Sequence, residues 1–366
     1  MLFVHRVFVL ALEGDVTDDF TTVYSALRRF LEGTPVYNEN YAFVDPHYLY
    51  SPGATLLLSP LGMVTHFDAA RLVFIVANAV AIILALGITA RILGFGWWHP
   101  IWPVSVAAAF ITETVRNTLI FSNINGLLLL VLVLFYWALI RERRWLAGIL
   151  IGLAILIKPI FLPLLFLPLV KANWQTIVAG LGLPVLLNAV AWPIVPQAGD
   201  YVTKTLAFVG GIRDFSNSSL RGMAVWSGMP TTLTAVLWLI FAAAVACGII
   251  VLLRYRYVLA TEWTLWTGSL LLVGVFFLSS LGQMYYSMYL FPLVLTVMAR
   301  ISPMHNPLAW LAAYGIFSSD DWIDSEIFPT EGMWMQYMLP TVGWGILILV
   351  IAVFAVSLWR GERTAS

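Results

Sequence analysis

Apolar runs about as long as a membrane crossing recur throughout this 366-residue chain, and they constrain its fold more than any other feature. About 20 apolar residues let a helix cross a hydrocarbon core of roughly 30 Å. The clearest runs are Ala69–Gly94, Asn125–Ile140, Trp174–Val195, Thr231–Leu253 and Pro340–Trp359. Only 10% of the residues are charged, which is far below the usual share in a soluble domain. The sequence predicts an all-α polytopic membrane protein.

The basic residues predict how the spans are oriented, because Lys and Arg favour short cytoplasmic loops. Most basic clusters fall on one side if Leu146–Ile157 and Ile160–Val170 run in opposite directions and the chain turns at Lys158-Pro159. About 11–12 spans result, counting a short first span at Leu2–Leu12. We expect the single cysteine, Cys247, to be a packing residue within its apolar run.

The acidic residues gather on the opposite side of this topology. Only Glu142, Glu262 and Glu362 lie on the cytoplasmic side. The polar residues concentrate in three outer segments, at 13–67, 196–230 and 318–339. We therefore expect one domain, 1–366, in the plasma membrane, with its functional site on the periplasmic face.

The first outer segment contains a predicted amphipathic helix at 18–32. Thr17 is a suitable N-cap, and acidic residues in the first turn favour the helix dipole. Apolar residues then follow at helical spacing up to a stop at Gly33 and Pro35. The pattern predicts a helix that lies on the bilayer surface.

Asp18 and Asp19 stand at the start of this helix, and two interpretations are open. They cap the helix and compensate its dipole, or one of them is a catalytic base and the other a sugar ligand. Adjacent carboxylates repel each other, and this repulsion suits one of them to accept a proton from a hydroxyl. We favour Asp19 slightly as the base.

Lys158 is an ammonium group in an apolar run, directly before a helix-breaking proline. It is either a lysine that extends to the membrane surface or a cation that faces a lipid phosphate. The break at Pro159 would also free backbone groups to line a polar cavity.

Other polar residues are candidates for phosphate or sugar binding. His47 is assigned to phosphate, and Tyr48 and Tyr50 to the sugar, against the alternative of an interfacial aromatic belt. Asn123 and Asn125 interrupt an apolar segment, so they are either helix-packing residues or part of a pocket wall.

Later segments supply further candidates, but without metal-ligand spacing. Arg213 and Arg221 are assigned to phosphate; the acceptor sugar is assigned to Asn217, Gln283 and Tyr286. The chain has no phosphate-binding glycine loop and no Cys/His cluster, so we expect neither a nucleotide-driven reaction nor a metal or other cofactor.

Several long motifs resemble the polytopic GT-C glycosyltransferases of the GT87 type. The first is TDDFTTVYSALRRFLEGTPVYNENYAFVDPHYLYSPG, the loop that contains both aspartates. The others are TETVRNTLIFSNINGLLLL, LIKPIFLPLLFLPLV, GIRDFSNSS and SLGQMYYSMYLFPL. The resemblance covers nearly the whole chain and implies the GT-C fold, with interfacial helices in the first periplasmic loop.

Within that family, the similarity to arabinofuranosyltransferases implies the substrates. The donor would be decaprenylphosphoryl-β-D-arabinofuranose, and the acceptor an α(1→5) arabinan of arabinogalactan or lipoarabinomannan. Transfer to the arabinan 3-hydroxyl would proceed with inversion. The alternatives are a mannosyltransferase that uses polyprenyl-phosphate mannose, and a transporter or flippase for a lipid-linked sugar. The sequence leaves the oligomeric state open, and no nucleic acid partner is expected.

Overall fold

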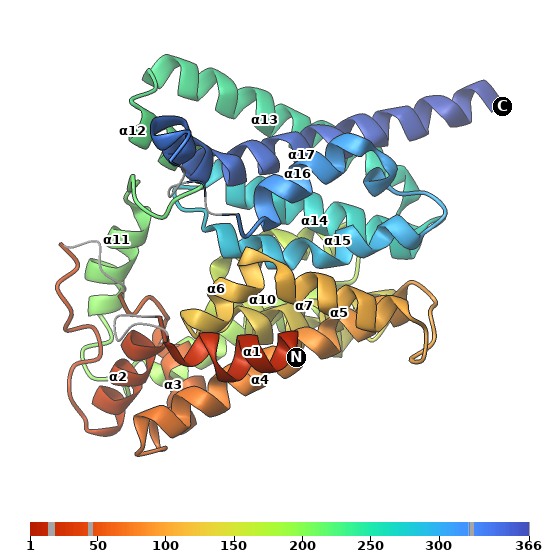
Figure 1. Ribbon diagram of the computed structural model, residues 1–366. Helices are drawn as coiled ribbons and strands as arrows, with labels where there is room; N and C mark the ends of the chain where they lie inside the picture. The colour runs from red at the N-terminus through yellow and green to blue at the C-terminus, as the bar shows by residue number, and fades with distance from the viewer. Residues whose placement is uncertain (14–18, 43–46, 321, 323–325, 366) are drawn as a thin grey trace. The chain divides into compact units, whose positions relative to one another are not determined.

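The computed structural model describes residues 1–13, 19–42, 47–320, 322 and 326–365. These residues form helices and loops without a β-strand, which confirms the predicted all-α class (Figure 1). The helices up to residue 169 are α1 (Leu2–Phe8), η1 (Leu10–Glu13), α2 (Asp19–Leu31), α3 (Pro52–Gly62), α4 (Phe67–Ile92), α5 (Ile101–Ile111), α6 (Glu113–Ile120), α7 (Asn125–Ile140), α8 (Arg144–Ile157), η2 (Pro159–Leu165) and α9 (Phe166–Leu169).

The remaining helices follow after residue 173, and their lengths vary widely. They are α10 (Trp174–Ala191), the π-helical turn η3 (Tyr201–Thr205), α11 (Leu206–Gly210), α12 (Leu220–Ser227), α13 (Thr231–Leu252), η4 (Leu253–Tyr255), α14 (Ala260–Leu278), η5 (Met284–Leu290), α15 (Phe291–Leu295), η6 (Thr296–Met298), η7 (Pro303–His305), α16 (Pro307–Phe317) and α17 (Pro329–Ala365).

Five helical stretches in the described part of the chain are long and apolar enough to cross a membrane. They are Phe67–Ile92, Trp174–Ala191, Thr231–Tyr255, Ala260–Leu278 and Pro329–Gly361. Shorter apolar helices, such as α7 and α8, lie between them. The chain is therefore a multi-pass membrane protein, as predicted; the total of 11–12 spans stays a prediction.

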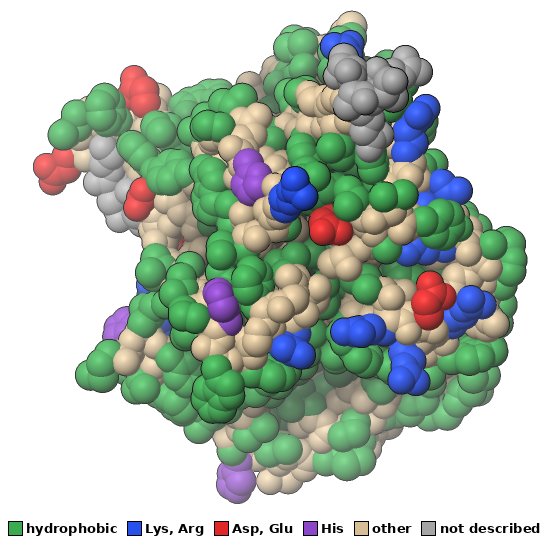
Figure 2. Space-filling view, turned by 90° about the vertical axis from the view of Figure 1, so that its right-hand side faces the viewer, with side chains coloured by type: hydrophobic (Ala, Val, Ile, Leu, Met, Phe, Trp, Pro, Cys, Tyr) green, Lys and Arg blue, Asp and Glu red, His purple; other side chains and the backbone are tan. Residues whose placement is uncertain are grey.

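The surface of the long helices is apolar, as expected for contact with lipid. In the stretch Thr231–Tyr255, which contains α13, only 11% of the most apolar 18 residues are buried. Leu239 and Ile250 are more than half exposed. Figure 2 shows hydrophobic side chains over much of one face, with charged and histidine side chains among them. Exposed apolar side chains along a helix of this length would be unfavourable in water. Cys247, expected as a packing residue, is exposed on α13, because an apolar run alone does not show which side faces protein.

The chain divides into two compact units, which we describe separately. Unit 1 comprises Met1–Ile88 and Val115–Gly211, and unit 2 comprises Thr89–Thr114 and Ile212–Ser366. The single domain spanning 1–366 stays a prediction. All sequence-predicted site residues before position 211 belong to unit 1, and the rest belong to unit 2.

In unit 1, α8 and α10 lie side by side and run in the same direction. The Thr176 hydroxyl donates to the Arg144 carbonyl at 2.8 Å near the start of both helices. Further along, a Cβ added at Gly152 would lie 3.2 Å from the Leu183 Cβ. Because consecutive parallel helices need a returning connection, the chain reverses after Lys158 and comes back through η2 and α9. The predicted turn at Lys158-Pro159 is thus present.

Helix α2 occupies most of the predicted segment 18–32, and its apolar side packs against protein. Phe20 and Leu27 are buried, and the Phe20 ring lies 5.5 Å from the Phe67 ring and 5.4 Å from the Phe74 ring. The Tyr24 hydroxyl donates to the Val64 carbonyl at 2.6 Å. The amphipathic pattern therefore reflects packing on α3 and α4, which cover the stripe that we expected to face the bilayer.

Unit 2 is built around the close approach of α17 to α13 and α16. At Gly315, an added Cβ would lie 2.8 Å from the Leu339 carbonyl oxygen, and at Gly343 2.9 Å from that of Ala312. Trp344, fully buried, donates its indole N–H to the Ser287 hydroxyl at 2.9 Å. These contacts fix the first half of α17 against the segment around η5.

Candidate active site

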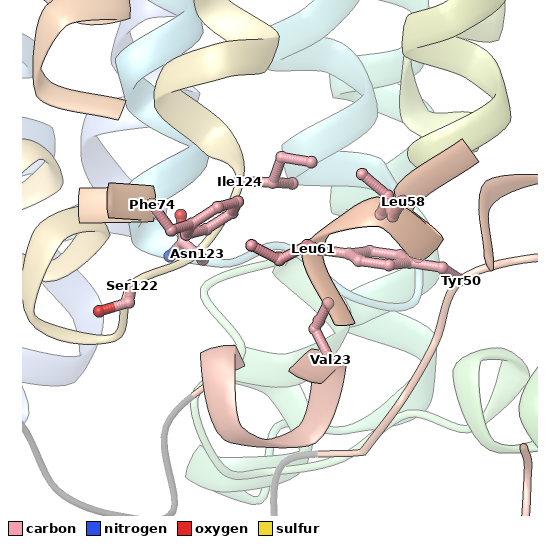
Figure 3. Close-up of a pocket in the computed structure, with 8 residues that line it drawn as sticks. All are labelled: Val23, Tyr50, Leu58, Leu61, Phe74, Ser122, Asn123 and Ile124. Carbon is pink, nitrogen blue, oxygen red and sulfur yellow. The ribbon is translucent and has the colours of Figure 1, made fainter. Parts of the chain in front are cut away.

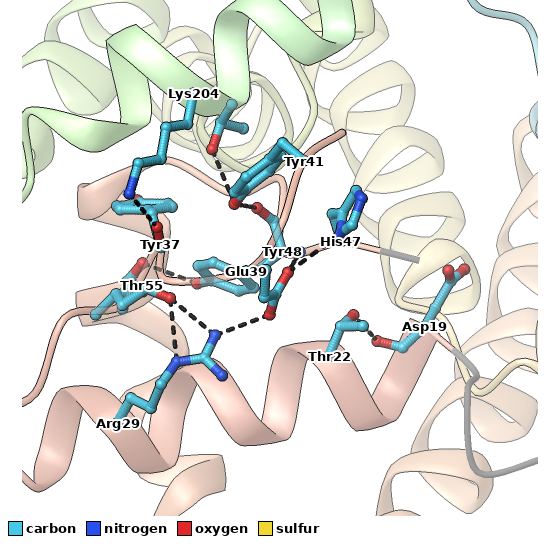
Figure 4. Close-up of polar contacts among 12 residues, drawn as sticks. Asp19, Thr22, Arg29, Tyr37, Glu39, Tyr41, His47, Tyr48, Thr55 and Lys204 are labelled. Carbon is cyan, nitrogen blue, oxygen red and sulfur yellow. Dashed lines mark hydrogen bonds and ion pairs between the residues drawn. The ribbon is translucent and has the colours of Figure 1, made fainter. Parts of the chain in front are cut away.

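Asp19 is held at the start of α2 by a contact between backbones. The amide of Phe20 donates to the carbonyl of Phe121 at 3.3 Å, which joins the first turn of α2 to the loop before α7. The Thr22 hydroxyl donates to the Asp19 carbonyl at 3.0 Å and closes the same turn (Figure 4). Asp19 itself is half-buried. Asp18 and the predicted N-cap Thr17 lie outside the described residues.

The loop from Ser122 to Asn125 is compact and strongly constrained. Ser122 has a positive φ of 47°, which is uncommon for a residue other than glycine. The Asn123 side-chain oxygen accepts a hydrogen bond from the Asn125 amide at 3.2 Å. The next residue, Gly126, leaves no room for a side chain, since an added Cβ would lie 2.7 Å from the Asn78 carbonyl oxygen. The start of α7 is therefore fixed against α4.

Lys158 reaches this loop from the end of α8. Its backbone is extended, with φ −135° and ψ 106°, because Pro159 ends the helix. The ammonium group donates to the Asn125 side-chain oxygen at 2.7 Å, and Asp19 is close enough for its charge to act on Lys158. The structure thus brings together three of the residues predicted from sequence, each from a different helix.

The loop before α3 closes the same region. The Ser51 hydroxyl donates to the Leu156 carbonyl at 3.3 Å, two residues before Lys158. The Gly53 amide donates to the Asn188 side-chain oxygen at 2.9 Å. A Cβ added at Gly53 would lie 2.8 Å from the Asn188 backbone nitrogen. Only glycine allows so close an approach of α3 to α10. The start of α3 therefore lies beside the end of α8.

A small, mostly apolar pocket opens between these elements (Figure 3). Its lining residues are Val23, Tyr50, Leu58, Leu61, Phe74, Ser122, Asn123 and Ile124. Tyr50 and Asn123, both predicted as sugar ligands, thus border the same space. The buried amide nitrogen of Asn123 has no hydrogen-bond partner among the described residues, and such a donor is unfavourable unless a ligand or water satisfies it.

Arg71 is a buried cation beside this pocket that the sequence analysis did not identify. Its side chain, 8% exposed, donates to the Ser122 hydroxyl at 3.2 Å and to the carbonyls of Ile120 at 3.1 Å and Ala11 at 3.4 Å. The guanidinium therefore ties three segments together next to Asn123. An arginine within the apolar run Ala69–Gly94 was the available signal.

His47 and Tyr48 belong to a separate polar network in unit 1, drawn in Figure 4. His47 lies 3.6 Å from the Glu39 carboxylate, which also accepts hydrogen bonds from the Tyr48 amide at 2.7 Å and from Arg29 at 2.8 Å. The Tyr48 hydroxyl bonds the Thr55 hydroxyl at 2.8 Å in the packed interior. These contacts favour a structural role; the sugar and phosphate roles stay predictions.

Burial keeps the phenols of this network neutral. It raises the pKa of Tyr48, and it raises the pKa of Tyr41 to about 12. The Tyr41 hydroxyl donates to the Tyr48 carbonyl at 2.9 Å and accepts from Thr205 at 3.2 Å. Neutral phenols with these partners hold the loop in place, and they are unsuited to remove a proton at neutral pH.

The remaining predicted residues lie in unit 2. Asn217 has both side-chain atoms bonded to backbone: its nitrogen to the Arg213 and Ser280 carbonyls, and its oxygen to the Ser219 and Gly282 amides. Four other predicted residues lie in this unit. Arg213 and Gln283 are half-buried, Tyr286 packs 5.6 Å from the Phe276 ring, and the Arg221 guanidinium lies 5.9 Å from the Trp238 ring centre. Their proposed roles stay predictions.

A helical membrane protein with a half-buried lysine, an aspartate and an apolar pocket at the ends of its helices fits a membrane-bound transferase. Residues 48–281 match glycosyltransferase family 87, and the chain belongs to this family. It is therefore a glycosyltransferase, and the transporter alternative is set aside.

Individual relatives are similar over most of their length. A protein from Corynebacterium glutamicum named alpha-(1->3)-arabinofuranosyltransferase is 55% identical over 365 residues, which cover 100% of this chain and 87% of that protein. Proteins of the same name from Mycolicibacterium smegmatis and Mycobacterium tuberculosis are each 40% identical, covering 95% and 94% of this chain and 81% and 80% of their own lengths.

Proposed function

We propose that this glycosyltransferase transfers arabinofuranose from decaprenylphosphoryl-β-D-arabinofuranose to the 3-hydroxyl of an α(1→5) arabinan. The observation that carries the proposal is the 55% identity, over the whole chain, to a protein named alpha-(1->3)-arabinofuranosyltransferase. The same names among the more distant relatives favour arabinofuranose over mannose as the donor sugar.

A β-linked donor that yields an α-linked product requires inversion, and one displacement with a single base accomplishes it. The acceptor 3-oxygen forms a bond to the anomeric carbon and gives its proton to a carboxylate. The bond between that carbon and the phosphate oxygen breaks, and its electron pair leaves with decaprenyl phosphate. We assign the base to Asp19 or its neighbour Asp18, with the other one orienting sugar hydroxyls.

Lys158 is the group proposed to bind the lipid phosphate. A fixed cation lowers the energy of a transition state in which negative charge grows on the leaving group. The hydrogen bond to Asn125 at 2.7 Å holds the ammonium at the start of α7, where the helix dipole also favours an anion. This scheme uses no metal ion or other cofactor.

Two polar residues at the small pocket support the proposal that a sugar hydroxyl lies nearby. Tyr50 and Asn123 border one pocket, and the buried Asn123 nitrogen would gain an acceptor when a sugar hydroxyl or phosphate oxygen binds. The distribution of Lys and Arg favours a topology in which the three polar outer segments are periplasmic, and this supports a periplasmic location for the reaction.

The test is transfer from synthetic decaprenylphosphoryl arabinofuranose to an arabinan oligosaccharide by the purified protein in detergent. We expect a new α(1→3) linkage, and no transfer when the donor carries mannose. The variants Asp19→Asn and Asp18→Asn identify the base. The variant that lacks the base should lose typically about 10²–10⁴-fold in rate, and the variant that lacks only the sugar ligand should lose less. The control is Glu262→Gln, which replaces a carboxylate in unit 2. Full activity in both aspartate variants would refute the assignment, and transfer of mannose alone would refute the donor.

A further inference from the structure

Unit 2 contains a second, larger pocket whose walls come from segments far apart in the sequence. It encloses about 590 Å³, including its open mouth. Asp214, Ser216 and Trp226 come from the segment around α12, Gln336 and Tyr337 from α17, and Met284 from the start of η5. The first two groups belong to the outer segments predicted at 196–230 and 318–339. The pocket therefore gathers residues that the topology places on one face of the membrane.

Aromatic rings form one side of this pocket. The Trp226 and Tyr337 rings lie 5.1 Å apart with an interplanar angle of 37°, and Trp334 packs edge-on against Trp226 at 4.6 Å. Tyr337 is 36% exposed and Trp226 is half-buried. Two rings held by their neighbours and still accessible provide an apolar platform with little conformational entropy to lose on binding.

Polar groups complete the lining. Gln336 is fixed because its side-chain oxygen accepts a hydrogen bond from the Trp322 amide at 3.0 Å. Asp214 contributes a carboxylate, and Ser216 lies at the exposed rim. Planar amide and carboxylate groups next to an aromatic platform match a ligand that has apolar C–H faces and many hydroxyl groups.

The pocket is built before any ligand binds, because its base is tied to the rest of unit 2. Asn217 links the loop to the Ser280 carbonyl at 2.8 Å and to the Gly282 amide at 3.0 Å. The Thr341 hydroxyl donates to the Ser218 carbonyl at 2.8 Å, which joins the same loop to α17. A preformed site binds more tightly, since less ordering is needed.

We propose that this pocket binds the arabinan acceptor, as a carbohydrate subsite on unit 2. The inference rests on the proposed function and adds the place where the glycan is held. A neutral furanose chain satisfies both the rings and the hydrogen-bonding groups. The Asp214 carboxylate disfavours a lipid phosphate, and the polar rim disfavours a hydrocarbon tail.

The test measures glycan binding without donor, so that it does not depend on catalysis. Isothermal titration of the full chain in detergent with a synthetic α(1→5) arabinan oligosaccharide gives the Kd. We expect Trp226→Leu to weaken binding about tenfold, or about 1.4 kcal/mol, and Gln336→Leu to act in the same direction. Trp98→Leu, a tryptophan that is fully exposed elsewhere in unit 2, is the matched control.

In the transfer assay, Trp226→Leu should raise the KM for arabinan by the same factor and leave kcat and the KM for the donor unchanged. The inference is overturned if the wild-type protein binds no arabinan, or if Trp226→Leu and Gln336→Leu, both folded by size-exclusion chromatography, bind it as the wild type does. Binding of arabinan without any arabinofuranose transfer would refute the proposed function and leave the carbohydrate subsite standing.

Discussion

Replacing Lys158 by methionine tests the proposed phosphate site most directly. Methionine keeps an unbranched side chain of similar length and removes the charge. The substitution removes the 2.7 Å hydrogen bond to Asn125 and the positive charge on which Asp19 acts. The rest of the interior stays packed, so the change isolates the ammonium group.

The expected loss follows from electrostatics. A cation about 4 Å from a phosphate oxygen contributes roughly 4 kcal/mol at an effective dielectric constant of about 20. Part of that interaction is already present in the bound donor, so only the fraction that grows in the transition state reduces kcat. We expect kcat/KM for the donor to fall about 10²–10³-fold, in the range found when one electrostatic stabiliser is removed.

Thermal stability distinguishes this chemical role from a structural one. Removing the ammonium relieves its desolvation but takes the donor away from the Asn125 side-chain oxygen, and these two effects oppose each other, so Lys158→Met should change the melting temperature little. Lys171→Met is the control, because Lys171 lies at the other end of the α8–α10 pair, on the side of Arg144. Activity of Lys158→Met within about threefold of the wild type, in folded protein, would refute the reasoning, since the calculation above requires a far larger loss.

Three further outcomes are expected. Gly126→Ala should destabilise the protein by about 1–3 kcal/mol in thermal unfolding, because its Cβ would overlap the Asn78 carbonyl, and a neutral effect would contradict the close packing of α4 and α7. Arg71→Met should lower both stability and donor binding, since it frees Ser122; Arg91→Met, an exposed arginine at the end of α4, should do neither. Raising the pH from about 10 to 12 should loosen the loop at Tyr41, because the raised pKa of its phenol means that the unfolded chain ionises first and the folded state loses stability over this range. Ultraviolet absorption should show the ionisation of Tyr41 only near pH 12. Ionisation near pH 10 would contradict its burial.

Local patterns in the sequence predicted much of unit 1. The proline after Lys158 correctly indicated a turn, because proline cannot continue a helix and a lysine in an apolar run needs a polar partner. The acidic start and apolar spacing of α2 likewise indicated a helix close to its observed bounds, Asp19–Leu31. Both predictions depend on interactions within a few residues.

Contacts between distant segments could not be predicted in the same way. Periodicity showed that α2 has an apolar side, but not that α3 and α4 would cover it instead of lipid. A polar residue such as Asn217 has the same appearance in sequence whether it binds a sugar or, as here, four backbone groups. Arg71 was overlooked because its partners, Ser122 and Ile120, lie about 50 residues away.

The reversal after Lys158 also determines how deep that residue can lie. The 14 residues of α8 span about 21 Å. The connection back through η2 and α9 has fewer residues, but it covers nearly the same length because a 3₁₀-helix rises about 2.0 Å per residue. With the Arg144 end at one surface of a hydrocarbon core of about 30 Å, the hairpin tip stops roughly 9 Å short of the other. A phosphate that meets Lys158 would therefore be drawn below the plane of the neighbouring headgroups, which selects a lipid whose own headgroup is small enough to follow it.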